Sequence, residues 1–262
     1  MRARPVFAQL LLLCLLAILH LQAAAAEKIT AGALLDGTPR ATPFYICDSG
    51  QAGPVVLVTG GVHGDEPAGA AAAEQIRHWQ VGKGKLIVLP MVNIRGVAAQ
   101  QRTMPGVEAP LADLNRDFAH ADRKGEVPRG RPAREIWQFV LRQKPGWLVD
   151  LHEAHTPHGA TDDSVGNTLL VVPSPALTKA EPALLQAVNA TITDRRYHFI
   201  VSRRPKDTTL ARAAGEHLGI HSFIIETAKS GQTLDVRVAE HCAIVKALLT
   251  HLAMEVEEKT EK

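Results

Sequence analysis

The chain has 262 residues, of which 46% are hydrophobic and 21% are charged, and its formal net charge is +2 at pH 7. An apolar fraction of this size is typical of a packed globular protein and excludes a disordered chain. The near balance of charge leaves no basic surplus for binding nucleic acid or an anionic membrane.

The N-terminal segment has the order of a secretory signal peptide. Arg2 and Arg4 precede an apolar run at 10–19, and four alanines follow at 23–26. The alternative is a membrane anchor, but a spanning helix needs roughly 20 apolar residues, and His20 ends this run early. The pattern therefore favours a cleaved signal over an anchor.

We expect residues 1–26 to be removed on export to the periplasm, which leaves one domain of residues 27–262 with no stable membrane anchor. Loss of two arginines reduces the basic residues from 29 to 27, against 27 acidic ones, so the mature chain has zero formal charge. A chain of this length buries a core without disulfide support. Cys47 and Cys242 either pair in an oxidising compartment or remain free thiols, and both alternatives stay open.

Short apolar runs alternate with segments of helical pattern along the mature chain. The expected strands are 55–59, 85–92, 147–151, 168–172 and 222–225. The expected helices are 66–80, 132–144, 176–192, 208–218 and 234–254. Residues 27–53 have a mixed pattern. Residues 93–131 are interrupted by proline and glycine, which is typical of a functional or mobile region.

Strands that are apolar throughout and alternate with helices predict an α/β fold, with a mostly parallel sheet covered by helices on both faces. Ligands of such folds bind at the carboxyl ends of the strands. The residues that follow each expected strand are therefore the candidates for a functional site.

His63 and Glu66 lie three residues apart where the first of these strands leads into a helix. An imidazole nitrogen and a carboxylate oxygen suit zinc, although a lone His-x-x-Glu pair is also common on solvated loops. His152 emerges at the end of the strand 147–151. It completes the three protein ligands of a catalytic zinc site, which leaves a position for water.

Two carboxylates accompany these ligands. Asp150 either orients the imidazole of His152 by a hydrogen bond or is simply polar at a strand end. Glu226 follows the strand 222–225 and suits a general base, which takes a proton from attacking water and passes it to a leaving amine. The alternative for Glu226 is a capping or surface role.

Polar residues in the irregular region suit recognition of an acid. Asn115 and Arg116 offer an amide and a forked guanidinium, which together hold a carboxylate in a fixed orientation. Arg102 either polarises a scissile carbonyl, binds a second acid group or is solvated. His155 and His158 are expected at the surface.

Four short motifs follow one another along the chain: His63-Gly64-Asp65-Glu66, Asp113-Leu114-Asn115-Arg116, Asp150-Leu151-His152 and Ile225-Glu226-Thr227. In this order they resemble the zinc carboxypeptidase superfamily, and most closely its succinylglutamate desuccinylase/aspartoacylase branch, over about residues 29–254. The resemblance implies one zinc ion per chain on His63, Glu66 and His152, a substrate carboxylate on Asn115 and Arg116, and Glu226 as the base.

The same resemblance implies a mixed, twisted sheet of about eight strands between helices. It also implies hydrolysis of an amide bond next to a residue that bears a carboxylate. Carboxypeptidases place a mobile tyrosine over the site, for which Tyr197 is the candidate. The chain after Glu226 is expected to form one helix, in place of the β-rich domain of aspartoacylases, and this difference favours peptides over small cytosolic amides.

We therefore expect a periplasmic zinc hydrolase of the carboxypeptidase type that acts on short peptides, with cell-wall peptide as the abundant substrate of that compartment. A deacylase of N-acyl amino acids is the alternative, with the same metal chemistry. A third alternative is a periplasmic binding protein that has kept the fold and lost activity. It predicts the loss of a ligand or of the base, and neither is missing.

Overall fold

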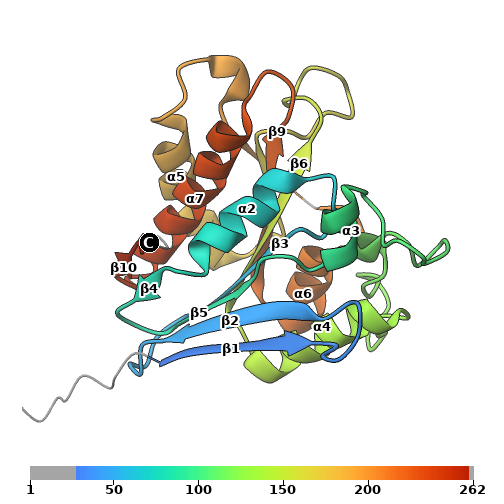
Figure 1. Ribbon diagram of the computed structural model, residues 1–262. Coiled ribbons are helices and arrows are strands. Elements are labelled where there is room, and N and C mark those ends of the chain that lie inside the picture. The colour runs from blue at the N-terminus through green and yellow to red at the C-terminus, as the bar shows by residue number, and fades with distance from the viewer. Residues whose placement is uncertain (1–27, 204, 260–262) are drawn as a thin grey trace, which may run out of the picture.

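An eight-stranded sheet forms the centre of the fold, with helices on both faces (Figure 1). The computed structural model describes residues 28–203 and 205–259, so the expected signal peptide lies outside the described residues. In sheet order the strands are β1 (Lys28–Leu34), β2 (Thr42–Asp48), β5 (Lys85–Leu89), β3 (Val55–Gly60), β6 (Trp147–Ala154), β9 (His221–Ala228), β7 (Thr168–Val171) and β8 (Ile200–Arg203).

The central strands β5, β3, β6 and β9 run parallel to one another. Antiparallel pairing begins on either side, between β2 and β5 and between β9 and β7, while β7 and β8 are again parallel. The predicted mixed, mostly parallel sheet of about eight strands is confirmed. A separate two-stranded sheet joins β4 (Gln80–Val81) to β10 (Val256–Glu257).

Two hydrophobic cores lie on the two faces of the sheet because side chains alternate along each strand. On β3, Val56 and Val58 pack in one core and Leu57 in the other. The first core is covered by α2 (Pro67–Ile76), α5 (Pro175–Asn189) and α7 (Leu234–His251). The second is covered by α4 (Arg131–Gln143) and α6 (Leu210–Leu218). Among the described residues, no helix has both the length and the apolar character needed to cross a bilayer.

Helix α2 crosses the sheet at very short distance. A Cβ atom at Gly69 would lie 2.4 Å from the carbonyl oxygen of Leu151 in β6, and one at Gly60 in β3 would lie 2.4 Å from the carbonyl oxygen of Gly69. Only glycine permits this approach. The start of α2 is thereby held beside the carboxyl ends of β3 and β6.

The expected strands and helices are all present, with shifted ends. The helix expected at 66–80 ends at Ile76, and the strand expected at 85–92 ends at Leu89. The mixed segment before Gly53 forms β1 and β2, and the irregular region contains α3 (Ile94–Ala99) and a short 3-10 turn at Leu114–Arg116. Cys47 is buried and Cys242 is partly buried, and the two do not pair with each other.

Candidate metal centre and catalytic cleft

Three metal-binding side chains meet at the carboxyl edge of the sheet. His63 lies in the turn after β3, Glu66 immediately precedes α2, and His152 is near the end of β6. Their ligand atoms all lie within 4.8 Å of one another, and all three residues are buried. Because β3 and β6 are parallel neighbours, their carboxyl ends share one edge, and the sheet brings together residues that are 89 positions apart.

The donor atoms converge on one point. Nδ1 of His63 lies 2.7 Å from Oε1 of Glu66, and Nδ1 of His152 lies 2.8 Å from Oε2 of the same carboxylate. The two Nδ1 atoms are 3.2 Å apart. Two imidazole nitrogens and a carboxylate that face one another in a buried site form a set that a divalent cation satisfies, and zinc prefers this set.

The opposite nitrogen of each imidazole faces an aspartate. Nε2 of His63 lies 3.1 Å from Oδ1 of Asp113, and Nε2 of His152 lies 3.0 Å from Oδ2 of Asp150. Asp150 is itself held by the hydroxyl of Thr59, which donates a 2.6 Å hydrogen bond. A carboxylate at Nε2 places the ring proton there and leaves the Nδ1 lone pair for a metal. Asp150 therefore orients His152, as one of the two sequence interpretations held.

Glu66 is fixed by two further contacts. Its Oε2 accepts a 3.1 Å hydrogen bond from the backbone N–H of Glu153, and its Oε1 accepts one of 3.1 Å from Nη1 of Arg102. Burial raises the pKa of Glu66, but His152 and His63 outweigh burial and hold the pKa well below its usual range. The ligand is an anion over the whole physiological pH range.

Glu226 lies next to this cluster, on the strand beside His152. The Cα atoms of the two residues are paired in the register of β6 and β9. Burial raises the pKa of Glu226 to about 8, with Glu66 and Asp150 adding to the rise and His152 opposing it. A carboxyl that titrates near neutrality exchanges a proton readily with a reacting group.

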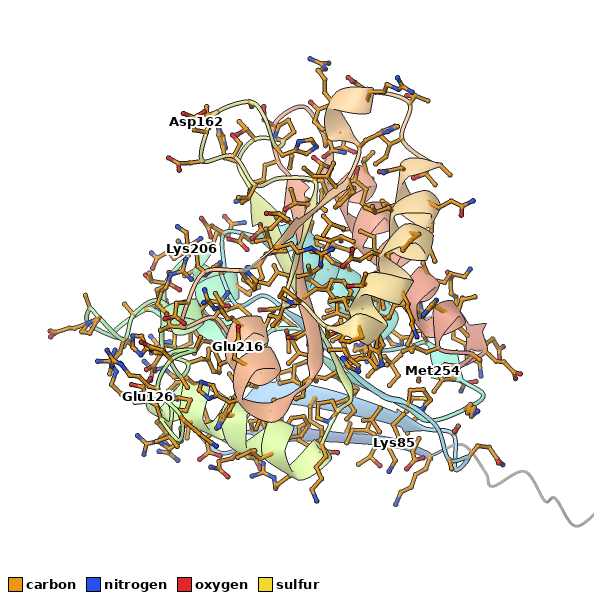
Figure 2. All side chains as sticks on the ribbon, turned by 180° about the vertical axis from the view of Figure 1, so that it is seen from behind. Lys85, Glu126, Asp162, Lys206, Glu216 and Met254 are labelled. Carbon is orange, nitrogen blue, oxygen red and sulfur yellow. The ribbon has the colours of Figure 1, made fainter. Side chains whose placement is uncertain are left out.

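A cleft of about 410 Å³ opens onto these residues. Four cationic side chains line it together with the metal-binding group and Glu226: Arg102, Arg116, Lys206 and Lys229. Lys206, labelled in Figure 2, lies on the segment between β8 and α6, and Nζ of Lys229 donates a 2.6 Å hydrogen bond to the carbonyl of Asp65. The cleft thus presents cations around a site that contains carboxylates.

The predicted carboxylate-binding pair also lines the cleft. Arg116 donates a 2.6 Å hydrogen bond to the backbone carbonyl of Asn115. The Asn115 Oδ1 is engaged within the protein, because it accepts a 3.0 Å hydrogen bond from the N–H of Leu210. The Nδ2 of Asn115 lies 3.2 Å from Nε2 of His152. Arg116 is therefore the freer of the two for holding a substrate acid.

Arg102 joins the cluster and Tyr197 does not. Besides Glu66, Arg102 contacts Oδ2 of Asp113 at 3.4 Å. The hydroxyl of Tyr197 donates a 3.1 Å hydrogen bond to the carbonyl of Ser230, and this side chain is not among those that line the cleft. His155, expected at the surface, is exposed and lies at the cleft wall.

Residues 52–252 match the model of the succinylglutamate desuccinylase/aspartoacylase catalytic domain. The chain belongs to this family. A curated relative, N-alpha-acetyl-L-2,4-diaminobutyric acid deacetylase of Halomonas elongata, is 31% identical over 134 residues, which are 50% of this chain and 34% of the relative. The chain therefore spans about a third of the length of that protein.

Solved structures share the fold of this desuccinylase/aspartoacylase domain. The apo cell shape determinant protein Csd4 of Helicobacter pylori has a TM-score of 0.66 at 20% identity, over 90% of this chain and 57% of Csd4. A succinylglutamate desuccinylase/aspartoacylase of Rhodobacter sphaeroides has a TM-score of 0.60 at 24% identity, over 91% of this chain and 70% of that one. At these identities the likeness establishes the fold.

Sequence reasoning missed three contributors to the site. Asp113 opens a motif that was recognised, and its position before Asn115 was the available signal. Lys229 follows Glu226 by three residues, which offered a weak signal. Lys206 follows no strand end of the parallel core, and only the folded chain places it at the cleft.

Proposed function

We propose that this domain is a zinc-dependent amide hydrolase that cleaves a short peptide next to a residue with a free carboxylate. The observation that carries the proposal is the buried group of His63, Glu66 and His152, with Glu226 beside it in one cleft. The set provides metal ligands and a proton carrier within the same small space, which is what metal-assisted hydrolysis needs.

The residues of the chain divide the work of hydrolysis. A zinc ion held by the three ligands would supply a Lewis acid that polarises the scissile carbonyl and lowers the pKa of water. Glu226 takes a proton from water while the water oxygen bonds to the carbonyl carbon. Glu226 then delivers that proton to the amine nitrogen when the C–N bond breaks. Arg116 holds the carboxylate of the substrate, and Arg102 stabilises negative charge that develops on the carbonyl oxygen.

A peptide substrate fits the cleft and the expected export of the protein. The cations around the site suit a ligand with more than one anionic group. Csd4, which shares the fold, has been solved with a tripeptide bound and is described as a D,L-carboxypeptidase.

We further propose that the protein acts in the periplasm, because its first 26 residues have the order of a secretory signal.

Deacylation of an N-acyl amino acid is the second candidate. The family model and the Halomonas deacetylase favour it. The two reactions use the same cluster and differ only in which side of the amide carries the recognised group.

Purified, zinc-loaded protein should be tested on tripeptide, tetrapeptide and pentapeptide fragments of cell wall and on acetylated and succinylated amino acids, with products identified by mass spectrometry. Release of a terminal amino acid from peptides supports the first candidate, and release of an acyl acid alone supports the second. No turnover of either panel by zinc-loaded protein would favour a binding protein instead. Fractionation of cells that express the full chain, compared with a chain lacking residues 1–26, tests export.

A further inference from the structure

A buried ion pair links helix α7 to the strand that carries His152. Nη1 of Arg237 in α7 donates a hydrogen bond to Oε1 of Glu153 in β6. The side chains are 10% and 0% exposed, and Nε of Arg237 also donates to the carbonyl of Thr233 at 3.2 Å. The guanidinium is thus held through two of its three nitrogens.

The second oxygen of Glu153 caps helix α2. It accepts a 2.8 Å hydrogen bond from the N–H of Ala68, the second residue of the helix. This N–H is one that an N-cap side chain usually satisfies, but Glu66 at the N-cap position makes no such bond. The carboxylate of Glu153, from strand β6, therefore caps the helix in place of the N-cap residue. Its negative charge also suits the positive end of the helix dipole.

The backbone of Glu153 completes a path to the metal site. Its N–H donates a 3.1 Å hydrogen bond to Oε2 of Glu66. This is the same oxygen that lies 2.8 Å from Nδ1 of His152. One residue thus holds both the helix that begins after Glu66 and one oxygen of the Glu66 carboxylate.

We propose that Arg237 is a positioning residue for the metal site, which acts through Glu153 to fix the direction of the Glu66 carboxylate. This inference rests on the proposed zinc site. A buried ion pair contributes little to stability, because the cost of desolvating two charges offsets their attraction. By contrast, removal of a residue that orients a metal ligand by hydrogen bonding commonly weakens metal affinity about 10-fold to 100-fold.

The test measures zinc affinity on protein that is shown to be folded. Arg237→Met is compared with wild type by circular dichroism, by competition for zinc with a chromophoric chelator and by the visible spectrum of the cobalt(II)-substituted protein. We expect zinc binding at least about 10-fold weaker and a changed cobalt spectrum. Arg237→Lys, which keeps the charge, should recover part of both.

A matched control removes another arginine–glutamate pair. Arg203 donates two 2.9 Å hydrogen bonds to Glu181. Arg203 pairs with Val171, and Val171 pairs with Phe223 near the start of β9, so this pair lies away from the carboxyl end that holds the site. Arg203→Met should leave zinc affinity and the cobalt spectrum unchanged.

Wild-type zinc affinity and an unchanged cobalt spectrum in folded Arg237→Met would overturn the positioning role and leave the proposed function intact. If that variant does not fold, the double variant Glu153→Gln/Arg237→Met removes both charges. It should fold and bind zinc more weakly, and wild-type affinity in it would overturn the inference equally. Absence of zinc binding by the wild-type protein would overturn the proposed function, and the inference with it.

Discussion

His152 and Glu226 stand side by side on neighbouring parallel strands, with their Cα atoms paired in the register of β6 and β9. The two side chains therefore belong to the same face of the sheet. A shift of this register by one residue would turn one of them to the opposite face, because side chains alternate along a strand. Strand pairing alone thus places a metal ligand beside the proposed base.

Replacement of the proposed base should separate metal binding from turnover. In Glu226→Gln, we expect zinc content to be unchanged and turnover to fall on the order of 100-fold or more, because the amide cannot take the proton of the attacking water. Metal analysis and steady-state kinetics on the active substrate class check this. Glu216→Gln, at the exposed carboxylate labelled in Figure 2, is the control and should retain full activity. Unchanged turnover in Glu226→Gln would remove Glu226 from the mechanism.

Removal of one ligand should abolish zinc binding. In His63→Ala only two ligands remain, which is too few for a catalytic site. For wild type, zinc at 100 times its dissociation constant should raise the free energy of unfolding by about 2.7 kcal/mol, and this gain should be absent in the variant. Thermal unfolding with and without zinc measures the difference. His251→Ala, at an exposed histidine at the end of α7, should keep the zinc-dependent increase in the free energy of unfolding. The same increase in His63→Ala would contradict the assignment of His63 as a ligand.

The parallel core and the metal ligands could be predicted because both produce local signals. The strands at Val55–Gly60 and Trp147–Ala154 are buried on both faces, so they are apolar along most of their length. His63 and His152 follow or end these strands, where ligands of such sheets gather. At these positions the apolar run that marks a buried strand is closely followed by the side chain that can bind a metal.

The edges of the sheet gave no such signal. Most of β1 is exposed, including Ile29, and β8 at the opposite edge exposes Ile200. Edge strands of this kind lack a continuous apolar run, so neither was predicted as a strand. The Arg237–Glu153 pair was also missed, since its partners are 84 residues apart and meet only when α7 packs on the sheet.

Arg116 should determine affinity for the substrate acid. Replacement by Met removes the guanidinium that holds the carboxylate, so we expect KM to rise about 10-fold or more while kcat changes little, a loss of roughly 1.4 kcal/mol or more. The same substrate with its carboxylate converted to an amide should be insensitive to the substitution. Steady-state kinetics on both substrates checks this, and an equal effect on both would show that Arg116 does not bind the acid.

Acid should destabilise the fold through His241, a fully buried residue of α7. Nε2 of this ring lies 3.4 Å from the hydroxyl of Thr227, while Nδ1 has no hydrogen-bond partner among the described residues. Burial, together with the nearby charge of His152, lowers the pKa of His241 from 6.5 to about 3. The folded protein therefore keeps this ring neutral at pH values where the unfolded chain protonates it.

The sign of the effect follows from the depressed pKa in the folded state. The contribution of neutral His241 to stability is complete above pH 6.5 and is lost as pH falls toward 3, by up to about 1.4 kcal/mol per pH unit. In His241→Gln, which cannot titrate, the free energy of unfolding should decline less steeply over this window. Denaturant unfolding at a series of pH values measures both slopes, with His251→Gln as the exposed control. Equal slopes in wild type and His241→Gln would show that another group governs the acid response.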